Sequence, residues 1–430
     1  MQRYEKYKDS GVDWIGEIPE HWECKRLGTW FTERREKVSD KDYAPLSVTK
    51  NGVVPQLDNA AKSNDGDNRK LVKEGDFVIN SRSDRKGSSG LSILDGSVSL
   101  INIVMKPRNI NENFSQYLLK SRAFVEEFYR NGHGIVADLW TTRFDEMKFI
   151  NISAPQIEEQ QTIATFLDDK TAKIDQTIAI KQKEIELLKE RRQILIQKAV
   201  TKGMDDTVKL KDSGVDWIGE IPEHWEVRKL RFEFNLSKGL TITKENLIEE
   251  GIPCVNYGEV HSKYGFEVNP SIHPLRFVPE DYLQTNPNSL LNKGDFIFAD
   301  TSEDLDGSGN FTYLNSNETV FAGYHTVIAR PKKNIESRFF AYEFDSPNFR
   351  NQVRTKMKGV KVFSITQSIL KDLTLWIPPY KEQKEITNYL DIKTSKIDQV
   401  ILLKQLEIEK LKEYKTVLID QVVTGKVKII

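Results

Sequence analysis

Apolar residues in two stretches of the chain, 158–200 and 381–423, recur at alternating steps of four and three residues. Each series has eight layers, and a cation occupies the third and the sixth layer of both. This spacing gathers the apolar residues on one side of an α-helix, as in a coiled coil. We therefore predict two long helices that pair with each other. The apolar seam positions are Ile174, Ile178, Ile185, Leu188, Leu195, Ile397, Ile401, Ile408, Leu411 and Leu418.

The seam cations bear on the direction of the two helices. In an antiparallel pair with matched ends, Lys181 would lie near Lys415 and Arg192 near Lys404. Long cationic stems can reach water from such positions. A parallel pair would match the layers equally well, so periodicity leaves both directions open. A two-fold axis relating two similar halves of the chain would reverse one helix against the other, and we therefore expect the antiparallel pair.

The remaining segments have a different pattern. Short β-branched and aromatic runs, such as Val98 to Val104, alternate with turns rich in Gly, Asn, Asp and Ser. One helix is expected at 114–130 and another at 337–355. The predicted fold class is α+β, with two strand-rich α+β domains separated by two long helices that form an antiparallel coiled coil.

The sequence also contains an internal repeat. The sixteen residues from Lys8 to Glu23 return without change as Lys211 to Glu226. A second pair of similar phrases, around Pro155 and Pro378, leads into the two long helices. Between these shared ends the two halves have little in common. A constant frame with different inserts indicates one scaffold that carries two different binding surfaces.

The repeat divides the chain into six segments. The predicted segments are frame 1–23, first insert 24–152, first helix 153–203, repeated frame 204–226, second insert 227–376 and second helix 377–430. The link that begins with Val200 to Gly203 and leads to Lys211 has its counterpart in the phrase from Val423 to Lys426, close to the end of the chain. We therefore expect the two chain ends to lie close together, as in a ring cut once.

Composition excludes several classes of protein. With 430 residues, 38% hydrophobic and 30% charged, the chain is large enough for two or more domains. No apolar stretch is long enough to span a bilayer, and Cys24 and Cys254 lie at unrelated places, so we expect a cytoplasmic protein with reduced thiols and no membrane partner. The net charge of −1 argues against binding that depends on overall positive charge, but a local basic stripe remains compatible with DNA.

The frame closely resembles the specificity subunit of Type I restriction–modification enzymes. The resemblance rests on the sixteen-residue phrase from Lys8, the Pro-Pro-x-x-Glu-Gln entry to each long helix and the Ile-Asp start of each coil. One departure is Gln156, which replaces the second proline of the first entry, and we expect it to change only the local strand-to-helix turn.

The resemblance implies a function without catalysis in this chain. Two target-recognition domains would each read one half of a split, asymmetric sequence in double-stranded DNA. The helices would set the half-site distance and dock two modification subunits that methylate adenine N6. Restriction subunits would complete the enzyme. No cofactor is expected in this chain, whereas S-adenosylmethionine, ATP and magnesium are expected in the partner subunits.

Two other classes of protein are alternatives to this interpretation. A catalytic methyltransferase or nuclease needs a cofactor loop or a catalytic strand motif, and Ile377-Pro378-Pro379-Tyr380 lacks the polar first residue that would hold a target amine. The six histidines show no metal-ligand spacing. A coiled-coil scaffold that binds only protein is the third class, and a test of DNA sequence preference separates it from the first.

Base readout and phosphate contacts need polar and cationic side chains on exposed loops. Three regions of each insert offer them: the loop after the Gly-Asp strand, the segment before the Pro-containing phrase, and an early turn. The candidate DNA-binding residues are Lys50, Asn51, Arg82, Ser83, Arg85, Lys86, Ser88, His133, Thr142, Arg143, Asn256, Tyr257, Thr301, Ser302, Asn310, Lys358, Lys361, Ser364 and Gln367.

Overall fold

The computed structural model describes residues 2–58, 66–135, 140–302, 307–357 and 363–429. The chain divides into two compact units, of which the first contains Met1–Gln182 with Lys404–Ile430 and the second contains Lys183–Leu403. These two units do not coincide with the six segments expected from the sequence. The boundary between the units falls inside both long helices, so each helix belongs partly to one unit and partly to the other. Among the described residues, no helix combines the length and apolar character needed to cross a membrane.

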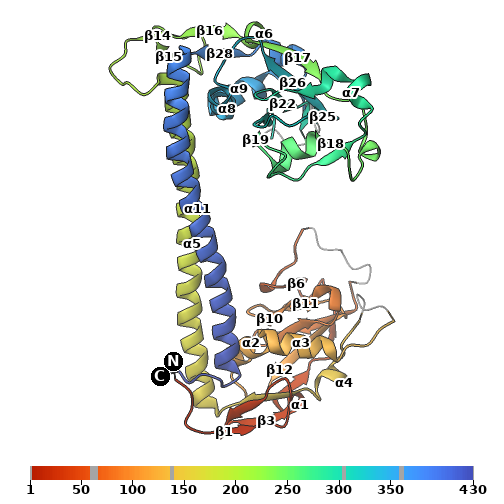
Figure 1. The fold of residues 1–430 in the computed structure, drawn as a ribbon. Coiled ribbons are helices and arrows are strands. Elements are labelled where there is room, and N and C mark those ends of the chain that lie inside the picture. The colour runs from red at the N-terminus through yellow and green to blue at the C-terminus, as the bar shows by residue number, and fades with distance from the viewer. Residues whose placement is uncertain (1, 59–65, 136–139, 303–306, 358–362, 430) are drawn as a thin grey trace. The chain divides into compact units, whose positions relative to one another are not determined.

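Both predicted long helices are present: α5 (Ile157–Lys202) and α11 (Tyr380–Val423). They lie side by side within each unit (Figure 1). In the first unit, Lys415 Nζ lies 2.6 Å from Asp175 Oδ2 and Lys181 Nζ lies 2.5 Å from Glu407 Oε2. Partners later on α5 thus pair with residues earlier on α11, and the pair is antiparallel. All ten seam residues are buried or half-buried.

The register of the pair differs from the expected one. Lys415 meets Asp175 rather than Lys181, and in the second unit Arg192 Nε lies 3.3 Å from Asp398 Oδ1. Matching the helix ends would have placed cation beside cation. The observed offset places Lys181, Arg192 and Lys415 beside carboxylates instead. It thereby removes the repulsion between cations that the matched arrangement would impose.

The first unit contains two sheets, a frame hairpin and a separate hairpin. The frame hairpin joins β1 (Tyr7–Asp9) to β2 (Glu17–Pro19), and β6 (Leu46–Thr49) pairs with β7 (Gly52–Pro55). The larger sheet has the order β10 (Ser89–Leu91), β9 (Phe77–Asn80), β12 (Asn102–Pro107) and β4 (Phe31–Glu33). The smaller has the order β11 (Gly96–Val98), β8 (Arg69–Val72) and β5 (Lys37–Val38).

The second unit repeats this plan with longer sheets. Its frame hairpin joins β14 (Leu210–Asp212) to β15 (Glu220–Pro222). The larger sheet has the order β17 (Phe234–Lys238), β26 (Thr326–Pro331), β22 (Phe296–Ala299), β24 (Phe311–Leu314) and β19 (Phe266–Val268). The smaller has the order β20 (Arg276–Val278), β18 (Ile252–Val255), β25 (Val320–Ala322) and β21 (Leu290–Leu291).

One more strand pair in each unit ties the start of the insert to its end. β3 (Glu23–Arg26) pairs with β13 (Asn151–Ala154), and β16 (Glu226–Lys229) pairs with β28 (Thr374–Ile377). Short helices α1 (Leu27–Trp30) and α6 (Leu230–Glu233) follow β3 and β16, and α7 (Tyr282–Thr285) lies later in the second insert. Both Pro-containing phrases leave two residues between strand and long helix, so the local change expected at Gln156 does not alter the length of the turn.

Each single helix predicted in the inserts is two helices. The four are α2 (Glu112–Lys120), α3 (Arg122–Arg130), α8 (Ser337–Asp345) and α9 (Pro347–Lys356). Ser121 and Ser346 separate them with extended backbone angles, and their hydroxyls accept hydrogen bonds from Phe124 N and Phe349 N. Serine favours this N-cap geometry, which breaks the helix. The predicted strand from Val98 to Val104 is likewise interrupted, since β11 ends at Val98 and β12 begins at Asn102.

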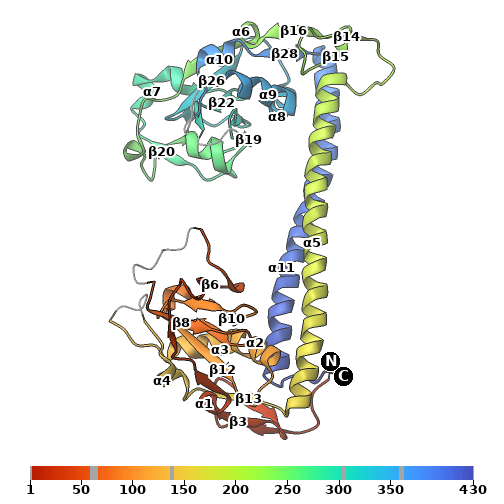
Figure 2. The ribbon, with the colours of Figure 1, turned by 180° about the vertical axis from the view of Figure 1, so that it is seen from behind.

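A continuous apolar core holds each unit together. In the first unit, buried residues from the frame, the insert and both long helices share one cluster, which includes Trp22, Phe114, Ile163 and Leu418. The second unit has the same construction around Trp225, Phe339 and Ile386. The chain ends meet in the first unit: Gln2 forms a β-bridge with Lys428, and Lys426 Nζ donates to Ile15 O at 2.9 Å (Figure 2). The expected closeness of the ends is confirmed.

The second core contains a buried carboxyl group. Glu343 on α8 is fully buried; its Oε1 accepts from Trp376 N at 3.0 Å, and its Oε2 has no partner. Burial raises the pKa of this carboxyl well above 4.5, although the Trp376 N–H opposes the shift. Leu118 holds the corresponding place on α2, seven residues into a helix of equal length.

We expect Glu343→Gln to remove a pH dependence of stability. Because the folded pKa is raised, native Glu343 keeps a proton that the unfolded chain releases above about pH 4.5, and the unfolding equilibrium constant rises by up to about tenfold per pH unit until the folded pKa is reached. Urea titrations of both proteins between pH 5 and pH 8 measure this. The glutamine variant should lack that slope, and parallel curves for the two proteins would contradict the assignment.

Candidate nucleic-acid interface

A carboxylate at the start of each long helix receives the frame. Trp22 Nε1 donates to Glu159 Oε1 at 3.3 Å, and His21 Nε2 lies 2.8 Å from Glu159 Oε2. Tyr4 OH adds a hydrogen bond of 2.7 Å. Burial, then the Glu159 carboxylate, raises the Tyr4 pKa well above 10. The identical phrase therefore has a structural role in which His21 positions an acid of α5.

The second unit repeats this joint. Trp225 Nε1 donates to Glu382 Oε2 at 3.1 Å, and His224 Nε2 lies 2.8 Å from the same oxygen. The neighbouring glutamine of the entry phrase, Gln383, donates to Pro378 O at 2.9 Å and accepts from Glu336 N at 3.0 Å. Each Glu-Gln pair thus ties one long helix to the frame and to the insert.

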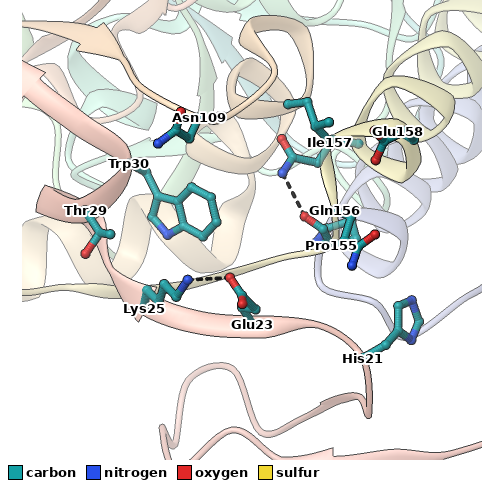
Figure 3. A pocket seen from close by; sticks show the side chains of 11 residues that line it. His21, Glu23, Lys25, Thr29, Trp30, Asn109, Pro155, Gln156, Ile157 and Glu158 are labelled. Carbon is teal, nitrogen blue, oxygen red and sulfur yellow. Dashed lines mark hydrogen bonds and ion pairs between the residues drawn. The ribbon is translucent and has the colours of Figure 1, made fainter.

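The first joint adjoins a hollow of about 430 Å³, lined by Trp30, Asn109, Gln156 and Ile157 among others (Figure 3). Gln160 closes one side, since it donates to Pro155 O at 2.8 Å and accepts from Asn111 N at 2.8 Å. Glu158 lies in the first turn of α5 and Lys25 pairs with Glu23 at 2.5 Å, so the charges around this hollow are mixed.

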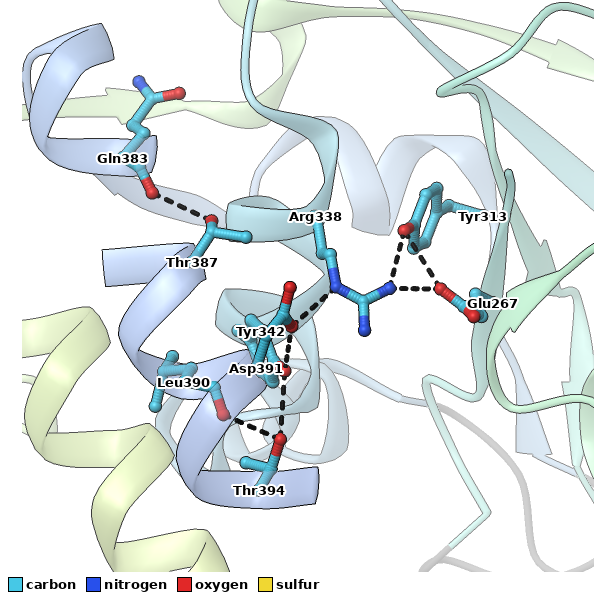
Figure 4. A network of polar contacts seen from close by, with 9 residues as sticks. All are labelled: Glu267, Tyr313, Arg338, Tyr342, Gln383, Thr387, Leu390, Asp391 and Thr394. Atoms are coloured by element: carbon cyan, nitrogen blue, oxygen red, sulfur yellow. Dashed lines mark hydrogen bonds and ion pairs between the residues drawn. The ribbon is translucent and has the colours of Figure 1, made fainter. Parts of the chain in front are cut away.

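A tyrosine fixes each insert to its long helix a second time. Tyr117 OH donates to Asp168 Oδ1 at 2.7 Å, and Tyr342 OH donates to Asp391 Oδ1 at 2.6 Å. The second insert adds Arg338, whose Nε lies 2.6 Å from Asp391 Oδ1 (Figure 4). Burial raises the pKa of Tyr117 to about 12. The inserts are therefore held against the helices at matching places, more strongly in the second unit.

Arg338 also reaches into the second insert itself. Its guanidinium pairs with Glu267 and donates to Tyr313 OH at 3.0 Å (Figure 4). Burial raises the pKa of Tyr313 to about 12, against the lowering effect of Arg338. Two strands of the larger sheet, β19 and β24, thus share one cation with a helix of the insert and with α11, which fixes the orientation of this insert on the helix.

Two of the candidate regions meet at the same edge in both inserts. The loop after the Gly-Asp strand begins at Ser81 in the first insert and at Asp300 in the second. Thr142 N donates to Ser81 O at 3.0 Å, and Ile365 N donates to Asp300 O at 2.8 Å. Regions that the sequence placed about sixty residues apart therefore form one surface, in equivalent places of the repeat.

In the first insert this edge is basic. A hollow of about 790 Å³ collects Lys50 from the β6–β7 hairpin, Arg82 and Arg85 from the loop, and Arg69 from β8. Among the described residues that line it, Asp84 has the only carboxylate, which lies 3.6 Å from Arg85. Arg82, Arg85 and Lys50 are exposed. An anion entering the hollow would therefore meet a concentration of positive charge.

In the second insert the equivalent edge differs. β23 (Thr301–Ser302) pairs with β27 (Phe363–Ser364), which precedes α10 (Gln367–Lys371). His325 Nδ1 lies 3.2 Å from Asp300 Oδ1, and His325 has a φ of +54°, a left-handed backbone that non-glycine residues seldom adopt. One edge thus offers arginines and lysine, and the other a histidine–aspartate pair with hydroxyl groups.

Several other candidates lie near these edges. Asn51 and Arg143 are exposed, Ser83 and Tyr257 are half-buried, and His133 forms a β-bridge with Thr141. Arg143 caps α4 (Phe144–Met147) with its backbone, whose N–H donates to Glu146 Oε2. Ser364 is exposed and Gln367 is half-buried at the start of α10. Lys358 and Lys361 lie outside the described residues.

Some candidates are buried in the folded inserts. They are Ser88, which lines the basic hollow, and Thr142, Asn256 and Ser302. Thr142 Oγ1 donates to Phe128 O and Asn256 Nδ2 donates to Cys254 O, so these side chains support the fold. The half-buried Asn310 accepts from Arg350 at 2.9 Å and donates to His261 O at 3.1 Å. Lys86 Nζ pairs with Glu126 at 2.6 Å, outside the lining of the basic hollow. The pattern of polar residues in the sequence could not separate inward from outward side chains.

Arg69 and His325 were absent from the sequence-derived candidates. Arg69 stands in the strand Arg69-Lys70-Leu71-Val72, where a cation more often points to solvent. His325 precedes a strand, and only its alignment with the loop after the Gly-Asp strand reveals its place. Among the residues that the structure describes, no cluster of His, Cys, Asp and Glu could hold a metal ion, and both cysteines are free.

A family model described as Type I restriction modification DNA specificity domain matches residues 19–190 and 222–412. The two matches correspond to the two halves of the repeat. The MjaVIII specificity subunit of a Type I restriction enzyme from Methanocaldococcus jannaschii is 26% identical over 428 residues, which cover 96% of this chain and 94% of that protein. The EcoKI specificity subunit of Escherichia coli K12 is 25% identical, with 87% and 82% covered.

Solved structures share the fold. A chain from a study of complex assembly and conformational transition of the type I R-M system superposes with a TM-score of 0.72 at 15% identity, covering 95% of this chain and 99% of that one. The HsdS subunit from Thermoanaerobacter tengcongensis gives a TM-score of 0.54 at 15% identity, with 95% and 98% covered. The two-unit fold with paired long helices is therefore found in other proteins.

Proposed function

Since this chain belongs to the Type I restriction–modification DNA specificity family, we propose that its two inserts are target-recognition domains that each read one half of a bipartite, asymmetric DNA site. The specificity subunit itself is non-catalytic. The observation that carries the proposal is the pair of equivalent edges with different chemistry, basic around Arg82 and Arg85 in one insert and histidine–aspartate in the other. A repeated frame with unlike edges suits two unlike half-sites.

The helices are proposed to set the half-site distance and to dock two modification subunits that methylate adenine N6. Leu187 and Ile194 support docking in the second unit, because they lie seven residues apart on one face of α5 and are 53% and 60% exposed. Ile194 also lines a hollow of about 610 Å³ with Ile218 and Pro347. In the first unit Tyr414 and Val417 of α11 are similarly exposed. S-adenosylmethionine, ATP and magnesium would bind to the modification and restriction subunits.

Methylome sequencing of a host with and without this chain tests the proposal. We expect methylated adenines in one interrupted sequence that disappear when the chain is removed. Purified chain with modification subunits should methylate the same sequence, and the chain alone should methylate nothing. Methylation by the lone chain would identify an enzyme instead, and a stable complex without sequence preference would identify a protein-only scaffold.

Arg85→Ala is expected to weaken DNA binding by the assembled enzyme several-fold. It should also reduce the slope of log K against log salt by the amount that corresponds to about one phosphate contact. Arg85 is exposed on the rim of the basic hollow, and its side chain is 68% exposed. Lys86→Ala is the matched control, because its amine pairs with Glu126. Fluorescence-anisotropy titrations over a series of salt concentrations measure both variants. Equal affinities for Arg85→Ala and the native chain at every salt concentration would remove this loop from the interface.

A further inference from the structure

The floor of the basic hollow contains a guanidinium that pairs with no carboxylate among the residues that the structure describes. Arg69 is only 5% exposed, and within the described part of the chain it donates only to Ser97: Nε donates to Ser97 Oγ at 2.8 Å and an Nη donates to Ser97 O at 3.0 Å. Since a guanidinium has five N–H groups, three lack an acceptor among the described residues. Burial lowers the Arg69 pKa, and the Asp40 carboxylate opposes that shift from a distance.

Other half-buried arginines in these inserts are paired. Arg34 forms an ion pair with Asp76 at 2.6 Å, and Arg330 forms one with Asp295 at 2.7 Å. Each of these acids follows the glycine of the Gly-Asp strand. In both halves the repeat therefore supplies a carboxylate that pairs with a structural arginine. Arg69 stands outside this arrangement. A buried cation is costly unless a charge or strong acceptors compensate for lost hydration, and two bonds to Ser97 do so only in part.

A second polar group on the same floor is incomplete. Asn102 is 5% exposed and lines the hollow; its Nδ2 donates to Ser99 O and Ser99 Oγ, whereas its Oδ1 has no partner. The acceptor on Asn102 is covered, so it is not open to a ligand as the structure stands. The N–H groups of Arg69 that are not bonded to Ser97 suit an anion such as a phosphate, whose oxygens accept hydrogen bonds.

We propose that Arg69 anchors a backbone phosphate of the DNA on the floor of this hollow, with Lys50, Arg82 and Arg85 drawing the strand in from the rim. The inference rests on the proposed function and assigns one positioning residue within it. The planar fork of a guanidinium suits two phosphate oxygens at once. Held by Ser97 on β11, the fork is fixed before DNA arrives, so the contact sets the register of the first insert on its half-site.

The test uses the full chain assembled with modification subunits and a duplex that carries the methylated sequence. Arg69→Gln is expected to weaken binding about tenfold and to reduce the slope of log K against log salt by about 0.9, the value for one phosphate. Arg69→Lys keeps the charge and loses the fork, so the slope should stay near native while affinity falls severalfold. Arg34→Gln controls for lost stability, because it breaks the ion pair with Asp76 outside the lining of the hollow and should lower the melting temperature without changing the slope.

A duplex series with one neutral methylphosphonate at each backbone position locates the contact. The native chain should lose affinity at one phosphate near the first half-site, and Arg69→Gln should be insensitive at that phosphate alone. Arg69→Gln with a lower melting temperature but native affinity and salt slope would overturn the assignment and leave the residue structural. Equal binding to every duplex of the series would likewise overturn the phosphate contact. A native complex that binds a duplex of unrelated sequence as tightly as the methylated sequence would instead defeat the proposed function, so the two failures are distinguishable.

Discussion

Replacing Trp22 with alanine is expected to lower the free energy of unfolding of the first unit by about 3–5 kcal/mol, the range for large aromatic side chains removed from a core. Trp22 is fully buried, lies among Tyr4 and Phe114, and donates its indole N–H to Glu159. The truncation therefore leaves a cavity and removes a hydrogen bond at the joint of frame, insert and α5. Typical domains have only about 5–15 kcal/mol in total, so the first unit would be close to unfolding.

Urea or thermal denaturation of the whole chain, followed by limited proteolysis to identify the unit that opens, measures this effect. Trp225→Ala tests the same joint in the second unit, since the Trp225 indole N–H donates to Glu382 as that of Trp22 does to Glu159. Trp217→Ala is the matched control, because Trp217 comes from the same phrase and is 43% exposed. If Trp22→Ala destabilised the chain no more than Trp217→Ala, the frame would not be the joint described here.

The sequence predicted those features that depend on local periodicity or on repetition. The heptad series gave the long helices to within a residue or two, because apolar spacing in a helix depends on few neighbours. The repeat predicted equivalent frames, and the structure gives His21 and His224 the same role. The strand-rich inserts and the heptad series predicted the fold class, and the resemblance to specificity subunits predicted the family.

The sequence did not predict features that depend on contacts between distant segments. The register of α5 against α11 follows ion pairs such as Lys415 with Asp175, whereas apolar layers alone match in more than one way. A serine hydroxyl breaks each insert helix, a local signal that hydrophobic periodicity conceals. The sheet topology brings the loop at Ser81 beside Thr142. The inward orientation of the Arg69 side chain depends on the residues that surround it in the folded insert.

Lengthening both long helices is expected to abolish methylation at the native site and, at one length, to create a new one. Seven residues inserted after Gln182 and seven after Leu403, at the boundaries between the units along the chain, preserve the seam and add about 10 Å to each helix. About three base pairs span that distance, but they turn the duplex through about 100°, whereas a heptad returns the helix face nearly to its starting direction. The two inserts would then face different sides of the DNA.

Three heptads in each helix add about 31 Å, close to the 34–36 Å of one full duplex turn. Under the proposed function, this variant with native modification subunits should methylate a sequence with the same half-sites and a gap longer by about nine to ten base pairs. The single-heptad variant should lose at least about a hundredfold at the native gap, since a misplaced half-site forfeits its specific contacts. Insertion into α5 alone controls for damaged helix pairing. The result is measured by sequencing methylated DNA from a library in which the gap between the half-sites varies. An unchanged gap in the three-heptad variant would show that the helices do not set the half-site distance.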